Sequence, residues 1–482
     1  MTTLPAGGIT THARRSSLAA AGAAPAREVP LYAKRENIYQ REAHGPWQRL
    51  RAVTLFILAG FYLVLPWLTW EGRQAVWFDL PRRKFYLFDL TFWPQDFIFL
   101  SWLLIIAALG LFFFTALAGR LWCGYACPQT VWTKVFMWIE WIAEGDRNQR
   151  IRLDRGPWTG EKVARKSAKH ALWLGVAIVV GTTFVGYFVP IRGLVARMAT
   201  FDVTTTETVA LAFFTLALYF DAGWMREQIC TYVCPYARFQ GAMFDTATLT
   251  IFYDPARGEP RGHRARSVTP AEAGLGDCID CGLCVHVCPT GIDIRNGTQY
   301  ECIGCAACID ACDEIMAEMH YSKGLVRYAT EESLRTGTTR ILRPRLVAYG
   351  AVIAGMVTLF GYALSQRVPL QLDVLRDRAR LYRYTPDGKV ENTYMLKIMN
   401  MDQHPHAYRI TTEAIAEASL AAPEEVRVGA DEIVDVPVRV QVPPDQLPRP
   451  SLPVVFHVES KDDPRIGVRE DSRFIAPSMV GR

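Results

Sequence analysis

Hydrophobic residues along this chain gather into five long blocks separated by polar stretches. The blocks are residues 52–70, 97–118, 171–190, 208–224 and 346–364. Each is close to the length of about 20 residues that a helix needs to cross a bilayer, which predicts five membrane spans; a buried core helix is the alternative for any single block. The fourth block carries Asp221 near its end. This carboxylate is either a proton-handling group or a residue that has reached the membrane interface.

After the last block the pattern changes to short alternations of apolar and polar residues. We expect strands at residues 393–399, 425–428, 433–442 and 452–458, with turns at 385–388 and 443–446. Several short strands at this spacing predict a β-sandwich. No constellation of titratable residues stands out in this tail, which favours a docking module over a catalytic domain.

Lysine and arginine predict the orientation of the five spans. The leader before the first block and residues 119–170 are rich in both, whereas residues 191–207 contain only Arg192 and Arg197. Basic loops stay in the cytoplasm, so the leader and the segment between the fourth and fifth blocks are expected there, and the tail on the opposite side. The net charge of +5 is then a topology signal and gives no reason to expect a nucleic-acid partner. The leader lacks the apolar core of a signal peptide and is expected to be a disordered arm.

Eight of the twelve cysteines repeat one spacing, C-x2-C-x2-C-x3-C, between the fourth and fifth blocks. The repeats are Cys278, Cys281, Cys284 and Cys288, then Cys302, Cys305, Cys308 and Cys312. This is the ligand pattern of a bacterial two-cluster ferredoxin, in which the fourth cysteine of each run binds the other cluster. A double zinc site or a disulfide framework is the alternative, but zinc prefers separated C-x2-C pairs and disulfide frameworks belong to small secreted domains.

The ferredoxin rule predicts two [4Fe-4S] clusters with crossed ligands. The first set is Cys278, Cys281, Cys284 and Cys312, and the second is Cys302, Cys305, Cys308 and Cys288. Pro289 follows the first run as the pattern requires, while Asp313 replaces the second proline. We expect this departure to be minor, because the thiolates bind the iron and the proline only shapes the turn that follows.

The remaining four cysteines form a second repeat, C-x-Y-x-C-P, just after the second and fourth blocks. Its members are Cys123 and Cys127, then Cys230 and Cys234. The two blocks run in the same direction, so both motifs are expected at the same depth on the cytoplasmic side. If the chain is still helical there, each pair shares a face; alternatively, the proline forces a break at the second cysteine. Thiolates in such a site select copper(I), zinc or an iron–sulfur cluster.

The order of these parts resembles one family. Five spans, two C-x-Y-x-C-P motifs, a two-cluster ferredoxin insert and an exported β-rich tail are similar to the CcoG/RdxA/FixG accessory proteins of cbb3-type cytochrome c oxidase assembly. Residues 143–148 (AEGDRN) add to the likeness. The resemblance implies a multi-pass bacterial inner-membrane protein with two [4Fe-4S] clusters and a periplasmic immunoglobulin-like domain. It also implies an oxidoreductase that reduces copper(II) to copper(I) for the oxidase.

The fold class expected from the resemblance is a multi-span α-helical membrane protein with an α+β ferredoxin domain and an all-β sandwich. The expected parts are an arm (1–51), four spans with the two motifs (52–224), a cytoplasmic segment (225–345, ferredoxin core 270–320), a fifth span (346–364) and the sandwich (365–482). We expect copper to be bound and reduced at Cys123, Cys127, Cys230 and Cys234. The expected partners are oxidase copper-assembly factors and an electron donor, either soluble or a quinol. A homodimer is possible as well.

Two other functions fit the same residues. The first is a quinol-linked relay, a membrane ferredoxin that feeds a periplasmic reductase, in which the C-x-Y-x-C-P pairs handle electrons and bind no copper. The second is a non-enzymatic assembly scaffold with structural clusters. Copper binding at the thiols separates copper reduction from the relay, and clusters that never change redox state would indicate a scaffold.

Overall fold

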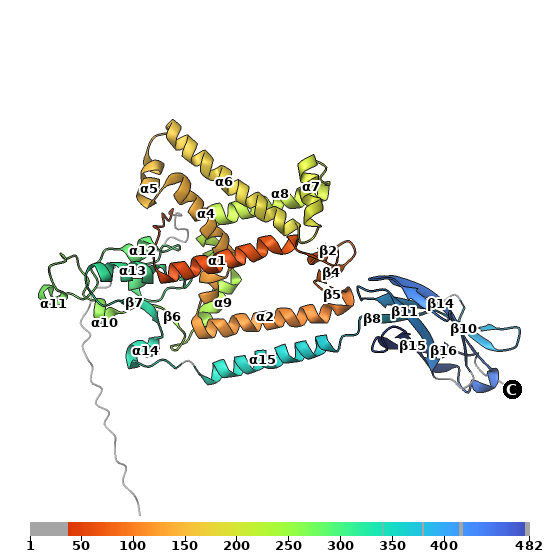
Figure 1. Ribbon diagram of the computed structural model, residues 1–482. Coiled ribbons are helices and arrows are strands. Elements are labelled where there is room, and N and C mark those ends of the chain that lie inside the picture. The colour runs from red at the N-terminus through yellow and green to blue at the C-terminus, as the bar shows by residue number, and fades with distance from the viewer. Residues whose placement is uncertain (1–36, 341, 378–379, 414–417, 478–482) are drawn as a thin grey trace, which may run out of the picture. The chain divides into compact units, whose positions relative to one another are not determined.

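The structure is a computed structural model that describes residues 37–340, 342–377, 380–413 and 418–477 (Figure 1). Most of the predicted arm, residues 1–36, lies outside the described residues.

Five helices are long and apolar enough to cross a membrane, at the five predicted blocks. They are α1 (Pro46–Val64), α2 (Phe97–Ala118), α6 (Gly160–Val185), α8 (Thr205–Phe220) and α15 (Pro344–Ser365). α2 matches its predicted bounds, and it leaves large apolar side chains such as Phe97 (65% exposed) and Leu104 (61%) uncovered. An apolar surface of this kind suits contact with lipid better than contact with water.

The third span differs most from its prediction, because α6 begins at Gly160 and ends at Val185 rather than covering residues 171–190. The first span also differs at both ends. α1 begins at Pro46, and a short 3-10 turn (Leu65–Trp67) ends it at Trp67. The helix starts earlier than the apolar block because Pro46 occupies its first turn, where a missing N–H costs nothing. It also ends earlier, because Trp70 belongs to β1 (Thr69–Trp70), which pairs with β2 (Arg73–Gln74).

Shorter elements that the apolar blocks did not predict connect the spans. Between α1 and α2 lies an antiparallel sheet of β3 (Val76–Asp79), β4 (Lys84–Leu87) and β5 (Leu90–Phe92). The helices are α3 (Leu121–Tyr125), α4 (Pro128–Glu144), α5 (Arg147–Arg155), α7 (Ile191–Thr200) and α9 (Pro235–Met243). α4 contacts α6, α6 contacts α8, and α2 lies beside α15 (Figure 1).

The cysteine-rich segment folds around two short helices and a two-stranded sheet. The helices are α12 (Leu283–His286) and α13 (Ala307–Glu318), and β6 (Thr250–Tyr253) pairs antiparallel with β7 (Val326–Ala329). Minor helices are α10 (Pro255–Gly258), α11 (Pro270–Ala273) and α14 (Glu331–Thr336). Ile251 and Val326 share a hydrophobic core with cluster-motif cysteines, so this unit is wider than the predicted core 270–320.

The C-terminal tail forms two antiparallel sheets around one apolar core. The first sheet has the order β12 (Ser419–Ala421), β14 (Ile433–Val442), β10 (Val390–Asn400) and β8 (Leu370–Arg376), with β9 (Arg383–Tyr384) beside β10. The second has the order β13 (Val426–Val428), β11 (His406–Glu413), β15 (Ser451–Ser460) and β16 (Gly467–Ile475). All four predicted strands lie in these sheets, whereas β8, β9, β11, β12 and β16 were not predicted.

The start of α1 contacts the cysteine-rich unit directly. The carboxylate of Asp310 on α13 accepts hydrogen bonds from the backbone N–H groups of Trp47 (3.3 Å) and Gln48 (2.7 Å). These are free N–H groups of the first turn of α1, where negative charge is favourable. The Gln48 side chain also donates to the carbonyl of Cys305 (3.0 Å). The first candidate span is therefore tied to the cysteine-rich fold at its N-terminus.

Candidate functional site

The eight ferredoxin-type cysteines surround two separate cavities. One, with about 380 Å³ of space that no protein atom fills, is lined by Cys278, Cys281, Cys284 and Cys312. The other, with about 340 Å³, is lined by Cys288, Cys302, Cys305 and Cys308, and Cys284 also reaches it. Each cavity thus brings together three cysteines of one run and the fourth cysteine of the other.

The surroundings of these thiols fit an iron–sulfur cluster. Apart from the cysteines, the cavity walls are mostly apolar, including Ile251 and Ile303 in one and Leu283 and Leu325 in the other. Burial raises the pKa of Cys284, Cys302 and Cys312 to about 12 each. Bare thiols here therefore keep their protons at neutral pH, and binding of a metal group must release them.

The two C-x-Y-x-C-P motifs adopt closely similar local structures. Cys127 is extended (φ −62°, ψ 128°) directly before Pro128, the first residue of α4. Cys234 is extended (φ −71°, ψ 109°) directly before Pro235, the first residue of α9. The first cysteine of each motif lies in a short helical turn: Cys123 in α3, and Cys230 in a π-helical turn, Ile229–Val233. The chain therefore breaks at each second cysteine, the second of the two predicted alternatives, because a residue before proline avoids the helical region.

All four membrane-motif thiols are close enough to influence one another. Burial raises the pKa of Cys123 to about 11, and the neighbouring Cys127 and Cys234 raise it further. Burial likewise raises the pKa of Cys230 to about 12, with contributions from Cys127, Cys123 and Cys234. Residues more than 100 positions apart in sequence thus meet in one thiol site. The thiol of Cys123 also donates a hydrogen bond to Oε1 of the fully buried Gln240 on α9 (3.4 Å).

The thiols are not arranged around a single ion. Among the described residues, no group of three or more His, Cys, Asp or Glu side chains is close enough to hold one metal ion. The same holds for the eight cysteines around the two cavities, whose spacing leaves room for a larger group. The four-thiol site would have to contract to hold one copper ion.

Arg120 is a functional candidate that the sequence patterns missed. It is 4% exposed, donates to the carbonyl of Ala237 on α9, and lies over the Tyr300 ring at 4.9 Å. Its positive charge lowers the pKa of Cys123, Cys230 and Cys302, against the larger effect of burial. This one cation therefore stabilises negative charge both in the thiol site and at the second cavity. The sequence feature that could have indicated Arg120 is its position directly after Gly119, the glycine that ends α2 with φ +56°.

The first motif contacts the cysteine-rich unit without intervening side chains. A Cβ atom on Gly124 would lie 2.9 Å from the carbonyl oxygens of Gly304 and Ile303, so only glycine fits there. The Gly304 carbonyl also accepts a hydrogen bond from the Tyr328 hydroxyl (2.6 Å). Cys123 packs against the apolar cluster that contains Cys305. The thiol site and the second cavity are thus direct neighbours.

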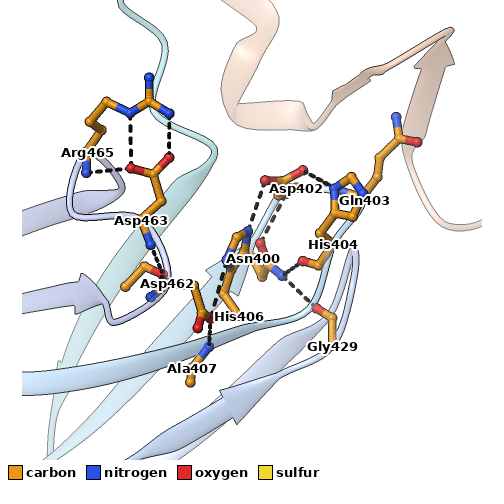
Figure 2. A network of polar contacts seen from close by, with 11 residues as sticks. Asn400, Asp402, Gln403, His404, His406, Ala407, Gly429, Asp462, Asp463 and Arg465 are labelled. Atoms are coloured by element: carbon orange, nitrogen blue, oxygen red, sulfur yellow. Dashed lines mark hydrogen bonds and ion pairs between the residues drawn. The ribbon is translucent and has the colours of Figure 1, made fainter.

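The sandwich does contain a cluster of titratable groups, contrary to the sequence-based prediction (Figure 2). Nε2 of His406 lies 3.0 Å from a carboxylate oxygen of Asp402, and its Nδ1 lies 3.8 Å from Asp462. Nδ1 of His404 lies 3.5 Å from Asp402. Asp402 and His404 lie in the β10–β11 turn, His406 begins β11, and Asp462 lies in the loop after β15, so only the fold brings them together.

Three family models match the chain. A 4Fe-4S dicluster domain matches residues 225–331, and an IG-like fold at the C-terminal of FixG matches residues 360–477. A 4Fe-4S binding domain matches residues 100–143, a stretch whose cysteines are Cys123 and Cys127. The first C-x-Y-x-C-P motif therefore lies within a segment that is similar to iron–sulfur proteins.

Relatives match most of the chain. Nitrogen fixation protein FixG from Rhizobium meliloti is 38% identical over 81% of this chain and 82% of its own length. Protein RdxA from Cereibacter sphaeroides is 40% identical over 80% of this chain and 84% of its own length. A crystal structure of a FixG-related protein from Vibrio parahaemolyticus matches 22% of this chain and 95% of its own, at 28% identity and a TM-score of 0.21.

Proposed function

The chain belongs to the family of FixG and RdxA, iron–sulfur electron-transfer proteins, and from that membership we propose that it is a membrane-bound cupric reductase. Copper(II) gains one electron at Cys123, Cys127, Cys230 and Cys234 and leaves as copper(I) for assembly of a cbb3-type oxidase. The observation that carries the proposal is the approach of the two C-x-Y-x-C-P motifs beside the second cysteine-lined cavity. The Cys123 thiol donates a hydrogen bond to Gln240 on α9, the helix that begins directly after Cys234, and Cys123 packs against the cluster that contains Cys305.

The two cysteine-lined cavities support the assignment of the cluster ligands. We assign one [4Fe-4S] cluster to Cys278, Cys281, Cys284 and Cys312, and the other to Cys302, Cys305, Cys308 and Cys288. When bound, these clusters supply one-electron transfer. The protein's own contribution is to bury Cys278, Cys284 and Cys305 and to hold the Arg120 charge near Cys302. Cys281 is exposed.

Soft thiol ligands give the reaction its direction. Thiolates bind copper(I) in preference to copper(II), so a site that contracts around the ion favours the reduced product. The break at Cys127 and at Cys234 lets each thiol move without bending a helix, because neither residue has helical backbone angles. Transfer of copper(I) to an assembly factor would then reopen the site.

The proposed arrangement in the cell follows the basic residues. The ferredoxin segment (225–345) lies in the cytoplasm, the five spans cross the bacterial inner membrane, and the immunoglobulin-like domain (365–482) lies in the periplasm. The five candidate helices support only the membrane crossing itself, by their length and composition.

A second candidate function rests on the match of residues 100–143 to a 4Fe-4S binding domain. In this alternative the four thiols hold a third cluster in a quinol-linked relay, and no copper binds. Their spacing, too wide for a single ion, favours this alternative.

The test is copper(II) reduction by anaerobically purified protein that has been reduced chemically beforehand. The variant carries Cys123→Ser, Cys127→Ser, Cys230→Ser and Cys234→Ser, and its iron content is measured in parallel. We expect the variant to keep about eight iron atoms, as two cubanes require, and to lose copper reduction. Undiminished copper reduction in the variant would contradict the proposal. Loss of about four of twelve iron atoms would support the third cluster instead.

A further inference from the structure

A large cavity lies among four helices on the membrane side of the thiol site. Its walls come from α1, α4, α6 and α8, and it holds about 1300 Å³ of space that no protein atom fills, part of it open to the surroundings. The lining is almost entirely apolar, with the aromatic residues Trp132, Phe184 and Phe214 among its members. Three of the four helices are candidate membrane spans, so an occupant could enter from the bilayer.

Two polar side chains line this cavity. The Tyr62 hydroxyl already donates a hydrogen bond to the carbonyl of Val180 (2.9 Å). Oδ1 of Asp221 is buried and has no hydrogen-bond partner within the part of the chain that the structure describes. An unpartnered buried carboxylate oxygen is costly, so a ligand that donates a hydrogen bond to it is favoured over one that cannot.

One end of the cavity reaches the thiol site. Ala126 and Pro128, on either side of Cys127, both contribute to its walls. Asp221 begins the π-helical turn Asp221–Met225 that leads toward the second motif. A molecule in the cavity would therefore contact the residues on both sides of Cys127, one of the four thiols.

We propose that this cavity binds the head group of an isoprenoid quinol, with a ring hydroxyl donating a hydrogen bond to Asp221. The ring lies against the aromatic lining, and the isoprenoid tail leaves between the helices toward the bilayer. A lipid acyl chain would fill the apolar space but leave Oδ1 of Asp221 without a partner. The inference rests on the proposed function, because it names the class of molecule that would serve as electron donor.

The test is photolabelling of the full-length, cluster-loaded protein in detergent with a photoreactive ubiquinol analogue. We expect labelled peptides from α4 and α8, protected by unlabelled decylubiquinol. Ala217→Phe fills the cavity and should lower labelling at least tenfold.

Asp221→Asn should weaken the affinity for decylubiquinol about tenfold, as loss of a hydrogen bond to a charged group predicts. The cavity is lined by Ala217 and Asp221 but not by Ala212 or Asp202, so Ala212→Phe and Asp202→Asn serve as controls and should label as the wild type does.

Three results would overturn the quinol site: labels on other segments, unchanged affinity in Asp221→Asn, or equal protection by a phospholipid with saturated chains. The last would identify the cavity as a lipid groove.

The labelling measures quinol binding directly, so its result does not depend on whether the protein binds copper. Normal labelling in a protein that cannot reduce copper(II) would reject the cupric reductase and keep the quinol site, whereas copper reduction with a chemical reductant and no labelling would do the reverse.

Discussion

At the scale of single residues, proline sets the geometry of the thiol site. The sequence showed that Cys127 and Cys234 precede prolines, and the extended conformation of both follows from steric exclusion of the helical region. It could not show that the fully buried Gln240 accepts a hydrogen bond from the Cys123 thiol. Nor could it show that the charge of Arg120 lies near both the four-thiol site and the second cavity. Those contacts join residues about 120 positions apart, which no local pattern encodes.

The crossed ligand sets make a prediction about single cysteines. Cys312→Ser should remove the cluster that Cys278, Cys281 and Cys284 hold, and Cys288→Ser should remove the other. Each variant should lose about half of its iron, as one cubane of two requires. Electron paramagnetic resonance of the reduced protein distinguishes the two losses, because each variant should lack a different signal. The same missing signal in both variants would contradict crossed ligation.

Asp402 makes the stability of the sandwich depend on pH. Burial alone would raise the pKa of Asp402, but hydrogen bonds from His406, from the Gln403 N–H and from His404 outweigh it and hold the pKa below its ordinary value. A carboxylate with a lowered pKa stabilises the folded state above its unfolded pKa, and the benefit is lost as the pH falls through the folded value. We therefore expect the hydrogen-exchange protection factors in β11, corrected for the intrinsic exchange rate at each pH, to fall below about pH 4.

The matched variant for that measurement is Asp402→Asn, which should lose protection in β11 already at pH 6 and vary little between pH 6 and pH 3. The other titratable groups at this site are His404, His406 and Asp462. An unchanged pH profile in Asp402→Asn would assign the dependence to one of them.

At the scale of elements, hydrophobic length predicts the spans well and their connections poorly. α2 and α15 match their apolar blocks nearly residue for residue, because a helix in lipid needs an unbroken apolar run. α4 was not predicted, because its buried face includes Lys134, Glu140 and Glu144, which interrupt the apolar pattern. Its position depends on tertiary ion pairs rather than on local sequence.

Glu140 is the centre of those ion pairs. Its carboxylate lies 2.9 Å from Nη1 of Arg150 on α5 and 2.5 Å from Nη2 of Arg226 after α8. Burial would raise the pKa of Glu140, but the two guanidinium groups outweigh it and lower the pKa. Glu140→Gln leaves two largely buried cations without a counter-charge and should lower the free energy of unfolding by about 3 kcal/mol.

The control for Glu140 is an exposed ion pair of the same type. Glu161 pairs with Arg165 one helical turn away at 2.9 Å, and both side chains are well exposed. Glu161→Gln should change the free energy of unfolding by less than about 1 kcal/mol. Denaturation of both variants in detergent provides the comparison, and equal effects would contradict a special role for Glu140.

At the scale of the whole molecule, the spacing of cysteines predicted both kinds of site but not their contact. The thiol site contacts the cysteine-rich unit where Gly124 lies against the Gly304 and Ile303 carbonyls. This contact joins two glycine-containing turns that are 180 residues apart. Nothing in either motif specifies the other. The contact depends on α1. Asp310 on α13 accepts a hydrogen bond from the N-terminus of α1, and Arg51 on α1 donates one to the Gly124 carbonyl (3.0 Å).

Gly124→Ala tests whether this contact matters for function. The added Cβ would lie 2.9 Å from backbone oxygen atoms that cannot move aside cheaply, so the cysteine-rich unit should shift away from the thiol site. We expect iron content to remain normal and the rate of copper(II) reduction to fall at least tenfold. Gly110→Ala in α2 is the control, because nothing lies within 4 Å of the added atom. Equal rates in the two variants would contradict a functional contact.

The most direct test of the central claim, that two distant motifs make one thiol site, is a copper(I) titration under anaerobic conditions. Wild-type protein is compared with a Cys123→Ser, Cys127→Ser variant and a Cys230→Ser, Cys234→Ser variant, with a chromophoric chelator as competitor. The shared site predicts one tightly bound copper(I) in the wild type and none in either variant. One copper(I) retained by each variant would show that the motifs act separately and would contradict the claim.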